Sequence, residues 1–220
     1  MAQDGRNVAA ADFANLATPV DLLVTGIGQL CTLDLPDSGS AGPRRGRLLG
    51  ELGIVEDAAL AVDCGRVVAY GPAAALAALG AKATYQADGA CVLPGFVDPH
   101  THAVYGRTRQ DEYERRLRGE TYLDIAAAGG GIHASVRDLR ARSEDELVAL
   151  TVPRLREALA CGTTTMEIKS GYGLSPQHEV KMLRAARRAA DEAGLRAVLT
   201  CLAAHEIPAE YRDRRGAYVD

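Results

Sequence analysis

The sequence lacks any apolar run that approaches the roughly 20 residues a helix needs to cross a bilayer. Its N-terminus, MAQDGRNVAAADFANLA, also lacks the order of basic and then apolar residues that marks a secretory signal peptide. Positive charge is not in excess, since 25 Lys and Arg stand against 29 Asp and Glu, for a net charge of −4. These absences argue against nucleic-acid and membrane partners, and they predict a cytoplasmic protein.

Cysteines are few, and none lies in a CxxC pair. Cys31, Cys64, Cys91, Cys161 and Cys201 are far apart and odd in number. In a cytoplasmic protein this pattern favours reduced, mostly buried thiols over disulfides or a zinc knuckle. The sequence also contains neither a GxGxxG nor a GKS pattern, so a nucleotide-binding loop is not expected.

The pattern of expected strands and helices divides the chain at about residue 90. Residues 1–90 contain short runs of β-branched residues between turns, which predicts a small β-rich domain. Residues 91–220 contain apolar strands separated by helices of a dozen or more residues, which is typical of parallel β/α units. The fold class is therefore α/β. The predicted strands of this second region are 94–98, 163–168 and 197–202, and its predicted helices are 109–128, 144–161 and 176–193.

A histidine pair, His100 and His102, follows the first strand of the second region. Side chains at i and i+2 on an extended backbone point to the same side, so both imidazoles could reach one metal ion. The C-terminal ends of strands are also where β/α barrels hold their active sites. The pair alone is a weak signal, because histidines at this spacing also cap loops.

The context of the pair makes the signal specific. The segment Pro94–His102, PGFVDPHTH, resembles the PGFxDxHxH motif of the amidohydrolase superfamily. Four more features occur in the order found in one member of that superfamily, the imidazolonepropionase family, and together they mark that family rather than the superfamily alone. They are Arg109, the turn AGGGI at 128–132, the segment TTTMEIKSGYGL at 163–174 and the segment AAHEIPAEY at 203–211.

The resemblance implies a TIM-like (β/α)8 metal-dependent hydrolase barrel preceded by a small β-sandwich domain. A complete barrel takes about 250 residues, whereas residues 91–220 provide about three of the eight strands. The family's remaining metal ligands and its proton-transfer groups are expected beyond Asp220. The resemblance therefore predicts no catalytic residue within this chain, and residues 1–220 alone are predicted to be inactive.

The resemblance also implies roles for individual residues. One zinc or iron ion would be bound by His100 and His102, and substrate by Arg109, Tyr122, Tyr172 and His205. A guanidinium suits a carboxylate, because the two groups pair through two parallel hydrogen bonds. Arg109 could instead be a surface helix residue, with Arg107 and Arg115 as competitors for its role. Tyr122 could belong to the core, and His205 could be structural.

Two further features allow more than one interpretation. The glycines at 129–131 could form an ordinary helix C-cap and turn, or a nest of N–H groups for an anion. Lys169 ends the second barrel strand, whereas the bridging lysine of two-metal amidohydrolases ends the fourth. It is therefore interpreted as an ion-paired lysine, with Glu167 as its partner, and one metal ion is expected rather than two.

The reaction implied by the resemblance is hydrolysis of the cyclic amide of 4-imidazolone-5-propanoate to N-formimino-L-glutamate, a step of histidine degradation. The family tends to form homodimers. One alternative is another amidohydrolase, such as a nucleobase-type deaminase, which would share the histidine pair but lack the EIKSGYG and AAHxxPxEY segments. A second alternative is a gene fragment without activity.

Overall fold

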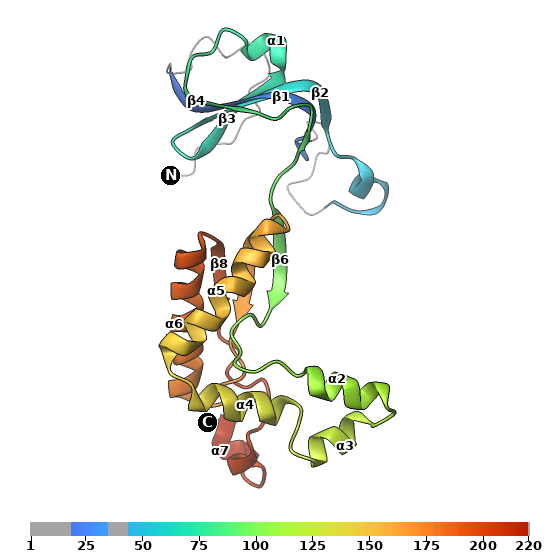
Figure 1. The fold of residues 1–220 in the computed structure, drawn as a ribbon, viewed down its shortest axis with the longest axis vertical. Helices are drawn as coiled ribbons and strands as arrows, with labels where there is room; N and C mark the ends of the chain where they lie inside the picture. The colour runs from blue at the N-terminus through green and yellow to red at the C-terminus, as the bar shows by residue number, and fades with distance from the viewer. Residues whose placement is uncertain (1–18, 35–43, 220) are drawn as a thin grey trace. The chain divides into compact units, whose positions relative to one another are not determined.

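The computed structural model describes residues 19–34 and 44–219 (Figure 1). The chain divides into two compact units, Met1–Pro94 and Gly95–Asp220, where the sequence analysis placed the boundary at residue 90. The first residues of the predicted β-rich domain, 1–18, lie outside the described part. Within the described residues, no helix is both long enough and apolar enough to cross a membrane.

The first unit is built on a five-stranded sheet in the order β3-β2-β1-β4, with β5 also paired to β1. β2 and β3 form a hairpin, and its turn places Cys64 (φ 50°) and Gly65 (φ 71°) in the left-handed region that a two-residue hairpin loop requires. The strands are β1 Val20–Cys31, β2 Ile54–Asp63, β3 Arg66–Pro72, β4 Ala81–Gln86 and β5 Cys91–Val92, and the short helices are η2 Gly46–Gly50 and α1 Ala73–Leu76.

The second unit contains a parallel sheet with the order β6-β7-β8. Its strands are β6 Phe96–Thr101, β7 Thr163–Lys169 and β8 Arg196–Thr200, which confirms the three predicted strands and the α/β class. The long helices α5 (Glu144–Ala160) and α6 (Pro176–Ala193) connect the strands and lie side by side against the sheet (Figure 1). Apolar side chains from both helices form one core with Met166 and Ile168 of β7.

Between β6 and β7 the predicted helix over 109–128 is wrong in detail. The segment instead forms α2 (Gln110–Leu117) and α3 (Tyr122–Ala127), and a helix that was not predicted, α4 (Ile132–Ala141), follows them. Gly119 has φ +95°, a conformation that ends a helix. Thr121 then starts α3 through a capping box with Asp124.

After β8 the described chain forms two short helices, η3 (Ala209–Tyr211) and α7 (Arg215–Val219). The expectation of mostly buried thiols is wrong. Cys31 is half-buried, and the other four cysteines are exposed. They lie at the turns and strand ends, where the small cysteine side chain does not reach either core.

Candidate active site

The histidine pair lies at the C-terminal end of β6. The ring centroids of His100 and His102 are 5.9 Å apart, with their planes at 68°. The backbone N–H of His100 donates a hydrogen bond of 3.2 Å to Oδ1 of Asp98, which stabilises the turn of the chain at this point. The spacing of two residues therefore brings the imidazoles close together.

His102 lies at the centre of a cluster of rings from three strand ends. Tyr172, in the loop after β7, stacks on it at 5.0 Å with an interplanar angle of 23°. His205, in the segment after β8, lies 5.2 Å from His102 and 6.2 Å from Tyr172. Parallel strands place their carboxyl ends at the same edge of a sheet, and this brings together residues more than 100 positions apart.

The electrostatic surroundings of His102 favour a neutral imidazole. Burial lowers the pKa of His102, and the positive charges that His205 and His100 can carry lower it further. Its Nδ1 atom is buried and has no hydrogen-bond partner among the described residues. A neutral ring with an unpaired buried nitrogen is what a metal ligand requires, and a second imidazole lies beside it.

A cavity of about 230 Å³ opens beside His102 and Tyr172. The loop after β6 lines it with Tyr105, Arg107 and Arg109, and none of the lining side chains is acidic. Arg109 forms a long ion pair with Glu112, whose Oε2 lies 3.7 Å from its Nη1. Arg107 is already paired with Asp111 at 2.7 Å, so Arg109 is the guanidinium of this lining that best suits a ligand with a carboxylate.

The structure does not bring Tyr122 into this cavity. Tyr122 is exposed on α3 and lines a second cavity of about 140 Å³, which shares Arg109 with the first. His205 contacts the cluster through its ring and does not line the first cavity. Of the predicted substrate-binding residues, Arg109 and Tyr172 share the cavity with His102.

The predicted ion pair of Lys169 is confirmed. Its Nζ lies 2.6 Å from Oε1 of Glu167, which also accepts a hydrogen bond from the hydroxyl of Thr200. Lys169 and then Thr200 lower the pKa of Glu167, so this carboxylate stays charged.

The glycine turn at 129–131 already has a partner within the protein, because the N–H of Gly131 donates a hydrogen bond of 2.8 Å to Oε1 of Glu112. This contact favours an ordinary turn over a nest of N–H groups that binds an external anion.

Sequence reasoning missed two residues of the site. Glu179 of α6 is 2% exposed, and its carboxylate accepts hydrogen bonds from the backbone N–H groups of Gly171, Gly173 and Leu174 at 2.7, 2.8 and 2.6 Å. It thereby holds the loop that presents Tyr172. One signal could have identified it, since Glu179 is a charged residue on the apolar stripe that continues through Met182.

Ser135 is the second missed residue. It belongs to α4, is 7% exposed, and lines the cavity beside His102. As a lining residue, it could form a hydrogen bond with a ligand in the cavity through its hydroxyl. No sequence pattern singled out this serine, because α4 itself was not predicted.

Comparison with known proteins identifies relatives of the chain. No protein-family model matches it. The imidazolonepropionase of Herpetosiphon aurantiacus is 48% identical over 200 residues, which are 91% of this chain and 45% of that protein. That of Symbiobacterium thermophilum is 46% identical over 206 residues, covering 92% and 47%, and that of Caulobacter vibrioides is 50% identical over 169 residues, covering 77% and 42%. Over the matched region, this chain belongs to the imidazolonepropionase family. It spans somewhat less than half the length of these curated relatives.

Solved structures agree with this family at the level of fold. A triazine hydrolase variant superposes with a TM-score of 0.55 at 19% identity, over 82% of this chain and 35% of the other. Guanine deaminase of E. coli gives 0.53 at 17% identity, over 80% and 35%. A mutant of the atrazine chlorohydrolase TrzN from Arthrobacter aurescens TC1, complexed with zinc and atraton, gives 0.50 at 20% identity, over 81% and 35%. The described chain therefore shares the fold of the corresponding part of these hydrolases.

Proposed function

We propose that this chain provides part of the metal site and of the substrate site of an enzyme that hydrolyses 4-imidazolone-5-propanoate to N-formimino-L-glutamate. The proposal depends on one observation above all. In a chain of the imidazolonepropionase family, the half-buried His102 of the histidine pair borders a cavity lined by two arginines and no acidic side chain. That cavity suits a small anionic ring compound better than a neutral nucleobase, because a nucleobase offers no carboxylate to Arg109, whose ion pair with Glu112 is long at 3.7 Å.

His100 and His102 would hold one zinc or iron ion. Their fit rests on the short separation of the two rings and on the unpaired, buried Nδ1 of His102. When bound, such an ion supplies a hydroxide nucleophile at neutral pH. The Lys169–Glu167 ion pair supports a single metal ion, because a lysine paired with a carboxylate of its own strand does not bridge two metal ions.

The other residues of the site would bind and orient the substrate. Arg109 would pair with the propanoate carboxylate, and Tyr172 and His205 would hold the imidazolone ring beside His102. Tyr122 would act from the second cavity, which Arg109 also lines. This arrangement fixes both ends of the substrate, and fixing both ends reduces the entropy lost on reaching the transition state.

The test is an assay of the protein in the length its gene encodes, with 4-imidazolone-5-propanoate, cytosine and guanine as alternative substrates. We expect turnover of the imidazolone only, and loss of turnover after removal of metal by a chelator. His100→Ala and His102→Ala should each lower the bound metal, measured by elemental analysis. Deamination of a nucleobase, or full activity in metal-free protein, would contradict the proposal.

The resemblance also leads us to propose a cytoplasmic homodimer for the natural protein. Sedimentation equilibrium of the purified protein and fractionation of cells test the two parts of this proposal separately. A monomer at micromolar concentration would contradict the first part.

A further inference from the structure

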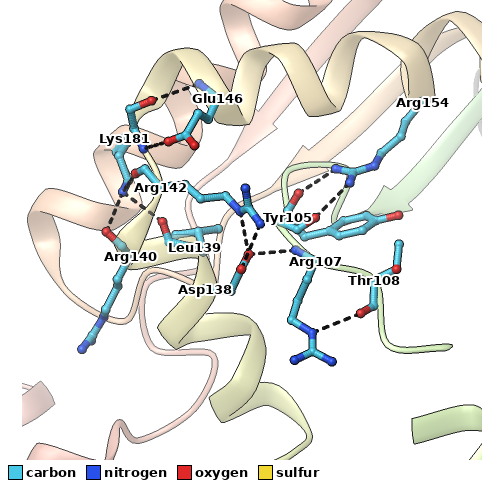
Figure 2. Close-up of polar contacts among 12 residues, drawn as sticks. Tyr105, Arg107, Thr108, Asp138, Leu139, Arg140, Arg142, Glu146, Arg154 and Lys181 are labelled. Atoms are coloured by element: carbon cyan, nitrogen blue, oxygen red, sulfur yellow. Dashed lines mark hydrogen bonds and ion pairs between the residues drawn. The ribbon is translucent and has the colours of Figure 1, made fainter. Parts of the chain in front are cut away.

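The loop Ala103–Thr108 connects the predicted metal ligand His102 to the predicted carboxylate anchor Arg109. It has no regular secondary structure, so its own hydrogen bonds do not fix its course. The separation of the metal ligand and the anchor therefore depends on what holds this loop. Figure 2 shows side chains of α4 and α5 that contact it.

Arg154 of α5 makes most of these contacts. Its Nη1 donates hydrogen bonds to the carbonyl oxygens of Ala103 and Tyr105 at 3.2 and 2.7 Å, and its Nη2 donates to that of Gly106 at 3.2 Å (Figure 2). The guanidinium carbon also lies 3.5 Å from the centroid of the Tyr105 ring. A planar guanidinium can bind several carbonyls and stack on a ring at once, which an ammonium group cannot do.

A second contact fixes the loop from α4. Asp138 accepts a hydrogen bond of 2.8 Å from the backbone N–H of Arg107, and its carboxylate is itself held by Arg142 at 2.8 and 3.0 Å (Figure 2). The backbone at Gly106 packs so closely on this pair that a Cβ atom there would lie 1.6 Å from Oδ2 of Asp138. The loop therefore has no room to shift toward α4.

The end of α4 that carries this pair is fixed in turn by Lys181 of α6. Its ammonium group donates to the carbonyl oxygens of Leu139, Arg140 and Arg142 at 3.0, 3.2 and 2.7 Å (Figure 2). These carbonyls lie at the C-terminal end of the helix, where backbone carbonyls run out of intrahelical donors, and the Leu139 carbonyl also accepts the N–H of Arg142 at 3.3 Å. The loop is thus bound to elements whose own positions are set by the core of the unit.

We propose that Arg154 is a positioning residue that sets the distance between the histidine pair and Arg109, and thereby selects the length of the substrate's acid side chain. This inference rests on the proposed function. Arg154 lines neither cavity of the candidate site, so it acts through the loop. A substrate bound at both ends reacts well only when its side chain matches the distance between the two binding groups.

The experiment uses the natural-length enzyme and imidazolones that carry an acetate, propanoate or butanoate arm. We expect the wild type to prefer propanoate. Arg154→Ala should raise KM for propanoate by about tenfold to a hundredfold, typical of a misplaced binding group, and should bring the kcat/KM values of the three substrates closer together. Bound metal should be retained. Guanidinium ion added to Arg154→Ala should restore part of the preference for propanoate.

Arg156→Ala is the matched control. Arg156 lies on the same helix, is exposed, and has only long contacts with Glu192, so its removal should leave KM and the length preference unchanged. If Arg154→Ala is insoluble, Arg154→Lys and Asp138→Asn provide the measurement. Each weakens the hydrogen bonds to the loop Ala103–Thr108 but keeps a side chain of similar size in place.

The possible results separate the two proposals. A wild type that turns over none of the three imidazolones overturns the proposed function. An active wild type whose length preference survives in every folded variant overturns the role of Arg154. So does an equal loss for all three substrates, because that loss would indicate general destabilisation of the site.

Discussion

At the scale of the residue, Arg109, which we propose binds the substrate carboxylate, makes only a weak contact within the protein. Its side chain is 41% exposed, and its ion pair with Glu112 is long, at 3.7 Å. In the natural enzyme, Arg109→Ala should raise KM by about tenfold to a hundredfold, because a hydrogen bond to a charged group contributes roughly 1.5–3 kcal/mol. Steady-state kinetics measure this, with Arg118→Ala as the control, since Arg118 is exposed and pairs with Glu114. An unchanged KM would reject the carboxylate assignment.

Ser135 leads to a second prediction at this scale. Ser135 is 7% exposed and lines the cavity beside His102, so its hydroxyl could form a hydrogen bond to a substrate. Ser135→Ala should raise KM roughly fivefold, for a bond of about 1 kcal/mol, with little change in thermal stability. Thr151→Val is the contrasting variant. The Thr151 hydroxyl is also buried but donates to the carbonyl of Leu147 at 2.7 Å, so its removal should lower stability and leave KM unchanged.

At the scale of the element, the loop after β7 depends on one carboxylate from the next helix. Glu179 accepts three backbone N–H groups and is almost fully buried. In Glu179→Gln an amide NH₂ would face N–H donors, so we expect a loss of about 2–4 kcal/mol in the free energy of unfolding. Denaturant unfolding measures this loss, and Glu157→Gln, on the exposed side of α5, serves as the control. A KM that stayed normal in folded Glu179→Gln would show that Tyr172 keeps its place without this carboxylate.

At the scale of the whole molecule, the parallel sheet determines how residues 1–220 behave when expressed alone. β6 and β8 form the two edges of the described sheet, and Val97 and Val198 on them are 65% and 52% exposed. Apolar edge strands pair with other chains, so we expect association that increases with protein concentration. The double variant Val97→Lys/Val198→Lys should increase the monomer fraction in size-exclusion chromatography. Ala149→Lys, on the exposed side of α5, adds charge elsewhere and should not. Equal profiles for all three proteins would contradict this account.

Local sequence signals alone predicted several helices, the three parallel strands and the placement of the histidine pair. Pro176 and Gly194 mark the ends of α6, and the structure has the helix at Pro176–Ala193 with Gly194 in the left-handed conformation. The three parallel strands were found because each is a short apolar run between helices. The spacing of His100 and His102 implied their shared side of the strand. These features depend on backbone geometry and on neighbours a few residues away, which a single sequence contains.

The tertiary structure alone decided which side chains share a site and what holds them there. Tyr122 was assigned to the substrate site, yet α3 places it in a second cavity beside Arg109. Arg154 is an ordinary arginine in a helical sequence, and Glu179 differs only in being a charged residue on an apolar stripe. Their partners are backbone groups of distant loops, and backbone groups carry no residue identity that a sequence could reveal. Such contacts exist only once the core has set the distance between a helix and a loop, so no local pattern could predict them.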